Sequence, residues 1–205
     1  MYDDKFYEVS RSGMQVSAEA LVPILMEQLE WPGTVLDVGC GEGWWAHEFA
    51  KHDCAVTGID GGWHGEHLLE ERFIPHNLAD PINLDKKFDT VVCLEVAEHL
   101  RPPRARSFIA DLCNLAHSYV VFSAAIPGQG GTGHLNEQWP DYWARLFNER
   151  GFAVNSDFRF TIWDDDRIEN WYRQNLMIAY RHDQPDSIPP PISVVHPVLY
   201  NARRR

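Results

Sequence analysis

Acidic and glycine residues within the stretch 34–49 have the types and spacing of a ligand-binding turn. Gly39, Gly41 and Gly43 alternate with other residues, and glycine permits sharp turns and close approach of a ligand to the backbone. The helix expected to follow would offer unpaired N–H groups and partial positive charge. Asp37 lies inside the preceding apolar strand, where a carboxylate without a partner is unfavourable. We therefore expect Asp37 to face a ligand; the alternative is a tight turn that binds nothing.

A second acidic residue, Asp60, follows the apolar run Cys54–Ile59 and precedes Gly61. It comes 23 residues after Asp37. An acid about 20 residues beyond a glycine turn, at the end of the second strand, can accept hydrogen bonds from the ribose hydroxyls of an adenosine. An Asp-Gly pair after a strand is also a common turn. We favour the ribose role for Asp60.

A glycine-rich loop with many polar side chains follows a later apolar run, over residues 126–143. Loops on rigid scaffolds often carry function. His134 is the expected general base, because histidine titrates near neutral pH and can take a proton from a hydroxyl or amine. His99 is the second candidate base, and Glu137 is a further catalytic candidate. The alternatives are that His134 and Glu137 cap the next helix, and that His99 is a core or capping residue.

The same loop contains side chains of metal-ligating types. His134 and Glu137 are three residues apart, and Glu95 or His99 could complete a site for a divalent ion. The acidic run 164–166 is expected to be a solvated turn or a helix cap. We expect no metal at this site.

The elements that must position these residues alternate between strands and helices. Apolar runs predict strands, and amphipathic stretches with caps predict helices. This alternation favours an open parallel sheet, in which ligands bind beyond the carboxyl ends of the strands. The expected strands are Val35–Val38, Cys54–Ile59, Arg72–Leu78, Phe88–Val96, Tyr119–Ala125, Phe152–Phe160 and Asn175–Tyr180; the expected helices span about 17–30, 44–52, 63–71, 102–116 and 137–150, with a short helix before Trp171.

Two motifs resemble those of a known family. The run VLDVGCGEG is similar to the first motif of the class I S-adenosylmethionine-dependent methyltransferases, an acid followed by G-x-G-x-G. The dinucleotide fingerprint G-x-G-x-x-G fits less well, since Trp44 takes the place of its third glycine. The run FDTVVCLEVAEHL resembles the fourth motif of the family. In element order, the resemblance covers residues 34–181.

This resemblance implies a single-domain α/β fold with a mostly parallel seven-stranded sheet flanked by helices, whose last strand is antiparallel. It implies S-adenosyl-L-methionine as cofactor and S-adenosyl-L-homocysteine as product. The implied cofactor residues are Asp37, Gly39, Cys40, Gly41 and Gly43 for the methionine part, Asp60 and Gly61 for the ribose, Asn77 and Leu78 for the adenine, and Leu94 and Glu95 beside the cofactor. Asp80 is an alternative to Asn77 for the polar contact with adenine.

Composition limits the partners and the compartment. The chain has 205 residues and a net charge of −12, so nucleic acid, which needs local basic density, is a poor expected substrate. Four cysteines without a C-x-x-C pair indicate a reducing compartment. Without a membrane-spanning run or the apolar core of a signal peptide, the expected location is cytoplasmic. We expect a methyltransferase domain at 34–182, preceded by a segment and helix at 1–33 and followed by an extended proline-rich arm at 183–205.

The residues together favour a methyltransferase that acts on a small-molecule or glycan-like acceptor at O or N. Two alternatives remain open: a nicotinamide-dependent oxidoreductase, and an inactive S-adenosylmethionine-binding module that serves a partner subunit. Trp44 and the lack of a Tyr-x-x-x-Lys pair disfavour the first, and the polar loop at 126–143 argues against the second. The sequence leaves the oligomeric state open.

Overall fold

Seven strands form a single sheet in the computed structural model, which describes residues 4–61 and 68–202, with side chains from residue 13 onward. Their order across the sheet is β3-β2-β1-β4-β5-β7-β6. The apolar runs that the sequence shows at these strands are typical of strands that are covered on both faces. The strands are β1 (Thr34–Val38), β2 (Ala55–Asp60), β3 (Phe73–Pro75), β4 (Phe88–Leu94), β5 (Ala116–Ser123), β6 (Phe152–Asn155) and β7 (Met177–Arg181).

The first five strands are parallel, and β7 runs antiparallel to both of its neighbours, β5 and β6. This arrangement confirms the predicted fold class, including the antiparallel last strand. The chain passes from β1 outward to β2 and β3, then returns to place β4 on the other side of β1. Ligands of open α/β sheets bind beyond the carboxyl ends of the strands at such a reversal. The site is therefore expected beyond β1, β2 and β4.

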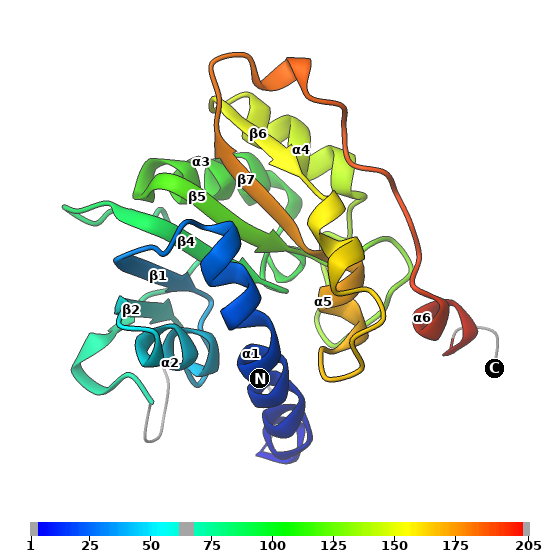
Figure 1. Cartoon of the computed structure of the whole chain (residues 1–205), viewed down its shortest axis with the longest axis horizontal. Coiled ribbons are helices and arrows are strands. Elements are labelled where there is room, and N and C mark those ends of the chain that lie inside the picture. The colour runs from blue at the N-terminus through cyan, green and yellow to red at the C-terminus, as the bar shows by residue number, and fades with distance from the viewer. Residues whose placement is uncertain (1–3, 62–67, 203–205) are drawn as a thin grey trace.

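Helices cover both faces of the sheet (Figure 1). One hydrophobic core joins α3 and α4 to the sheet, through residues such as Phe108 and Trp143. The other joins α1, α2 and α5 to the opposite face, through residues such as Leu25, Phe49 and Tyr172. The helices are α1 (Asp4–Gln28), α2 (Trp44–Lys51), α3 (Ala105–Leu115), α4 (Pro140–Asn148), α5 (Asn170–Asn175) and α6 (Pro197–Ala202). No helix in the described ranges is both long and apolar enough to cross a membrane.

Several predicted boundaries differ from the structure for local reasons. The helix expected from Glu137 begins at Pro140 instead, because the residue before a proline avoids the helical region, and Trp139 is extended. The strand expected over Phe152–Phe160 stops at Asn155, whose side-chain oxygen accepts a hydrogen bond from the N–H of Asp157 at 2.8 Å. That side-chain turn redirects the chain into a short 3-10 helix.

Other differences concern the termini and the region after β2. The first helix begins at Asp4, so it is longer than the expected 17–30. Pro23 lies in its interior. The third strand spans only Phe73–Pro75. Most of the helix expected over 63–71 lies outside the described residues.

The C-terminal arm packs against its own domain. Arg159 is fully buried and donates hydrogen bonds to the carbonyls of Gln174, at 3.1 Å, and Ile192. The N–H of His196 donates to the side-chain oxygen of Gln174 at 2.7 Å. The expectation that the whole arm is extended is wrong at its end, where α6 forms.

Candidate active site

The turn between β1 and α2 has left-handed backbone at its three glycines, Gly39, Gly41 and Gly43. A Cβ on Gly39 would lie 2.3 Å from a methyl of Val96, so this glycine is required by packing. A Cβ on Gly41 would meet no described atom within 4 Å. The backbone of the turn therefore has open space above Gly41, as a bound ligand requires. Cys40 is buried, so it can offer a ligand backbone groups only.

Asp37 lies at the bottom of this turn, with only 2% of its surface exposed. Its Oδ2 accepts a hydrogen bond from the N–H of Ala46, in the first turns of α2, at 3.2 Å. Burial raises the pKa of Asp37 to about 7; the bond from Ala46 opposes the rise, and the charge of Asp60 adds to it. A pKa this high means that ionising Asp37 in the folded chain has a free-energy cost.

Asp60 connects the end of β2 to the glycine turn. Its Oδ2 accepts from the N–H of Gly41 at 2.7 Å, and its Oδ1 accepts from the N–H of Gly61 at 2.6 Å. A carboxylate has about four lone-pair sites, so these two bonds leave acceptor capacity for ribose hydroxyls. A Cβ added to Gly61 would also meet no described atom within 4 Å. Asp60 thus lies between two stretches of backbone with open space above them.

Asn77 and Leu78 follow β3, which pairs with β2 so that Pro75 faces Asp60. Asn77 is exposed; its Oδ1 accepts from the N–H of Ala79 at 3.1 Å, and its Nδ2 donates to Asp80 at 3.2 Å. Leu78 is buried within the core. The two candidates for the polar contact, Asn77 and Asp80, therefore occupy the same turn, beside the Asp60 end of the site.

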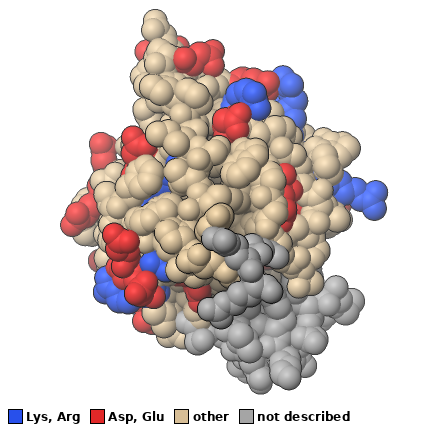
Figure 2. Space-filling model, turned by 90° about the vertical axis from the view of Figure 1, so that its right-hand side faces the viewer, with Lys and Arg blue, Asp and Glu red and all other residues tan. Residues whose placement is uncertain are grey.

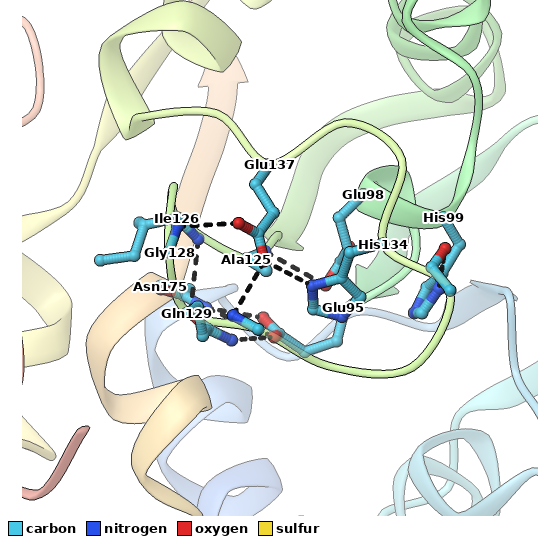
Figure 3. Close-up of polar contacts among 12 residues, drawn as sticks. Glu95, Glu98, His99, Ala125, Ile126, Gly128, Gln129, His134, Glu137 and Asn175 are labelled. Carbon is cyan, nitrogen blue, oxygen red and sulfur yellow. Dashed lines mark hydrogen bonds and ion pairs between the residues drawn. The ribbon is translucent and has the colours of Figure 1, made fainter. Parts of the chain in front are cut away.

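Leu94 is buried at the end of β4, and Glu95 follows it with a left-handed backbone, φ 55°. The carboxylate of Glu95 accepts hydrogen bonds from Nδ2 of Asn175 at 3.1 and 3.3 Å and from Nε2 of Gln129 at 3.2 Å (Figure 3). Burial raises the pKa of Glu95, and these bonds oppose the rise. Sequence reasoning missed Asn175, which no motif marks, and gave Gln129 no role beyond its place in the polar loop 126–143.

Glu98 is a functional candidate to which the sequence analysis assigned no role. Its side chain is fully buried; Oε1 accepts from the N–H of Ala125 at 3.1 Å, and Oε2 has no hydrogen-bond partner among the described residues. Burial, followed by the charge of Glu95, holds its pKa well above the usual range. Its backbone carbonyl accepts from the N–H groups of Leu135 and Asn136 at 2.7 and 2.9 Å. The signal available in the sequence was its place in the run EVAEHL.

The glycine-rich loop brings His134 against His99, the two candidate bases. Their rings make an edge contact with centroids 4.9 Å apart. Nδ1 of His134 lies 2.8 Å from Oε1 of Glu137, and Nδ1 of His99 lies 3.4 Å from the carbonyl oxygen of Gly133 (Figure 3). Burial lowers the pKa of His99, and His134 lowers it further.

Glu137 organises this loop. It accepts hydrogen bonds from the N–H groups of Gly128 and Gly130 at 2.8 and 2.9 Å as well as contacting His134. Burial alone would raise its pKa, but these hydrogen bonds outweigh burial and hold the pKa below the usual value. Because α4 begins at Pro140, Glu137 lies before that helix and its carboxylate is directed to the loop. The alternative in which it caps the helix is wrong.

Two groups of side chains therefore share the carboxyl edge of the sheet. Asp37, Asp60 and the glycine turn lie at β1 and β2, and the histidine pair lies beyond β4 and β5. Glu95 stands at the end of β4, the strand next to β1. A separate surface pocket lies at the opposite edge, beside Thr34, and none of the predicted site residues lines it.

Comparisons with known proteins place the fold in context. The curated magnesium protoporphyrin IX methyltransferase of Arabidopsis thaliana is 32% identical over 125 residues, which cover 56% of this chain and 40% of that protein. The ubiquinone biosynthesis O-methyltransferase of Erwinia tasmaniensis is 34% identical over 85 residues, covering 35% of this chain and 33% of that protein. The matches thus span less than half the length of these relatives.

Solved structures share the fold at lower identity. The magnesium protoporphyrin IX methyltransferase of Synechocystis PCC 6803, crystallised with S-adenosylmethionine, has a TM-score of 0.61 and 22% identity, with 88% of this chain and 86% of that chain covered. The sugar N-methyltransferase KedS8 of Streptoalloteichus has a TM-score of 0.65 and 14% identity, with 89% and 94% covered. The family model described as a methyltransferase domain matches residues 11–157, which confirms the predicted family. The chain therefore belongs to the methyltransferase domain family.

Proposed function

We propose that the protein transfers the methyl group of S-adenosylmethionine to an oxygen or nitrogen of a small-molecule acceptor. One observation carries this proposal. A Cβ on Gly41 or Gly61 would meet no atom of the described residues within 4 Å, and the carboxylate of Asp60 between them keeps acceptor capacity. An adenosine with a charged tail needs such a surface at the carboxyl ends of β1 and β2.

The residues at this edge fit the cofactor. We propose that the ribose hydroxyls bind to Asp60, the methionine part to Asp37 and the backbone of the turn, and the adenine beside Asn77 and Leu78, which follow β3. The sulfonium supplies an activated methyl group, so the task of the chain is positioning. The proposed contacts are Asp37, Gly39, Cys40, Gly41, Gly43, Asp60, Gly61, Asn77, Leu78, Leu94 and Glu95.

The acceptor is proposed to bind on the histidine side of the site. Nδ1 of His134 is engaged with the Glu137 carboxylate, so Nε2 is the ring nitrogen that we propose takes the acceptor proton. His99 is the second candidate base. The names of similar proteins support a small acceptor, since they refer to magnesium protoporphyrin IX, ubiquinone biosynthesis and a sugar.

Surface charge supports a small acceptor over nucleic acid. On the face shown in Figure 2, lysine and arginine side chains are few and stand among acidic ones, whereas a phosphate backbone needs a basic patch. We also propose a cytoplasmic location, which the four buried cysteine thiols support. The proposed methyltransferase domain is 34–182, flanked by the segments 1–33 and 183–205; the described helix α1 and the contacts of Ile192 and His196 support this division.

Calorimetric titration tests the cofactor directly. S-adenosylmethionine and S-adenosylhomocysteine should bind at one site per chain, and Asp60→Asn should weaken both. Binding of NADH, with no binding of either sulfur compound at millimolar concentration, would reject the proposal in favour of an oxidoreductase. Release of S-adenosylhomocysteine with a mixed panel of acceptors separates an enzyme from an inactive binding module.

A further inference from the structure

We propose that Glu98, His99 and His134 bind one divalent ion of a first-row transition metal. Each of these residues offers a ligand atom, and the three atoms lie within 4.8 Å of one another. Ligands bound at about 2.1 Å in tetrahedral geometry lie about 3.4 Å apart. The side chains would therefore have to move together by up to about 1.4 Å to hold the ion.

The surroundings of the two histidines fit a ligand role. Metal-bound histidines usually have their second ring nitrogen on a carboxylate or a backbone carbonyl, which fixes the tautomer and the orientation of the ring. His134 has Nδ1 on Glu137 at 2.8 Å, and His99 has Nδ1 near the carbonyl of Gly133 at 3.4 Å. Both kinds of supporting acceptor are thus in place, a carboxylate for His134 (Figure 3) and a backbone carbonyl for His99.

Glu98 supplies an independent observation. Its side chain is fully buried, and nothing in the described residues gives Oε2 a hydrogen bond. An unsatisfied buried acceptor is unfavourable by about 1–3 kcal/mol, and more if charged. An ion in contact with Oε2 would satisfy this atom. The alternative is a proton shared between Glu98 and Glu95, since both the charge of Glu95 and a side-chain hydrogen bond with it raise the pKa of Glu98.

The donor set selects the class of metal. Two imidazoles and one carboxylate suit zinc, iron, cobalt, nickel or manganese, whereas magnesium prefers oxygen ligands and retains several waters. Three protein ligands also leave coordination positions open, as in catalytic rather than structural sites.

The position of the ion gives it a task, and this step rests on the proposed function. The cluster lies where the acceptor is proposed to bind, so an acceptor oxygen could occupy an open coordination position. Lewis-acid binding would lower the pKa of an acceptor hydroxyl. His134 would then act as a ligand, and the acceptor hydroxyl would lose its proton to solvent water before the methyl group transfers. If His134 is a metal ligand, removal of the metal should lower turnover. If His134 is the base, removal of the metal should not lower it.

Cobalt(II) is the probe, because its visible absorption reports ligand number and geometry. Chelator-treated full-length protein is titrated with CoCl2, and zinc is used in competition. Wild type should bind one cobalt per chain. His134→Ala, His99→Ala and Glu98→Gln should each weaken binding by at least about 100-fold, and Glu137→Gln by about 10–100-fold because it supports a ligand.

His52→Ala is the matched control, since His52 also faces a glutamate, Glu48 at 3.9 Å, but on α2. It should bind cobalt like the wild type. Circular dichroism checks that each variant is folded, and His134→Ala, in a partly exposed loop, keeps the test valid if Glu98→Gln does not fold.

The proposal is overturned if the wild type shows no saturable cobalt binding at millimolar concentration, or if all ligand variants bind like the wild type. The titration contains no methyl donor, so its outcome is separate from that of the proposed function. Ion binding without binding of S-adenosylmethionine would reject the function alone. Binding of the cofactor without ion binding would reject the metal site alone.

Discussion

Replacing Asp37 with asparagine is expected to stabilise the protein above neutral pH and to weaken its binding of S-adenosylmethionine. Asparagine has the shape of aspartate, and its side-chain oxygen can accept the hydrogen bond that Ala46 donates to Asp37 at 3.2 Å. It carries no charge, so it removes the penalty of ionising a group that is 2% exposed. Because asparagine is uncharged, the variant also lacks the negative charge of Asp37, which we propose lies beside the methionine part of the cofactor.

The magnitude follows from the shift in pKa. Folding raises the pKa of Asp37 from 3.8 to about 7, and one unit corresponds to about 1.4 kcal/mol, so the full penalty is about 4 kcal/mol. The folded chain binds the proton more tightly than the unfolded chain. This favourable contribution is complete below pH 4 and is lost as pH rises towards 7. Between pH 5 and pH 8, the advantage of the variant should grow by about 2.5 kcal/mol.

Guanidinium unfolding, followed by the fluorescence of the eight tryptophans, measures this difference. Both proteins are unfolded at pH 5 and at pH 8 without cofactor, and the free energies are subtracted at each pH. Other titrating groups cancel in this double difference because they are common to both proteins. If the advantage of Asp37→Asn is the same at the two pH values, the assignment of a raised pKa to Asp37 is wrong.

Three further changes test other parts of the structure. Gly131→Ala would place a Cβ 2.3 Å from Nε2 of His134, so turnover, measured as S-adenosylhomocysteine release, should fall while cofactor affinity stays constant. Asp60→Asn should weaken cofactor binding in calorimetry by about 10–100-fold, since hydrogen bonds to a charged group contribute about 1.5–3 kcal/mol. Arg159→Met leaves two carbonyls without their buried donor, so limited proteolysis should cut residues 183–202 sooner, and the free energy of unfolding should fall by about 2 kcal/mol or more.

Matched variants isolate each effect. Gly128→Ala also adds a side chain at a positive φ, 80° against 157° for Gly131, but no described atom lies within 4 Å of the new Cβ, so it should leave the His134 ring in place. Turnover equally low in both would attribute the loss to backbone strain. Arg167→Met removes an exposed arginine and should not change proteolysis; if it does, the arm is not held by Arg159. Unchanged calorimetry for Asp60→Asn would exclude the ribose role.

The grouping of the residues proposed for the cofactor could be predicted from sequence because its signals are local. Asp37 and its glycines occupy one turn, and Asp60 ends the next strand, so periodicity alone brings them to one edge. The acceptor half depends on contacts between distant segments. Glu95 is 80 positions from Asn175, which binds it, and no local pattern records that pairing. The start of α4 at Pro140 was visible in the sequence, but the polar residues before it gave a competing signal.

The late position of β7 has a consequence for the order in which the protein is made. This strand lies between β5 and β6, where it pairs with Tyr119–Phe122. During synthesis, β5 therefore presents an open apolar edge until β7 emerges roughly 60 residues later, which takes about 3 to 12 seconds at ordinary elongation rates. An unpaired edge of this kind is a template for association with other chains. Asn175, which completes the Glu95 cluster, also arrives only at this stage. A nascent chain made as far as residue 157 thus contains every residue that the family model matches. It still lacks β7 and Asn175, so neither the sheet nor the candidate site is complete.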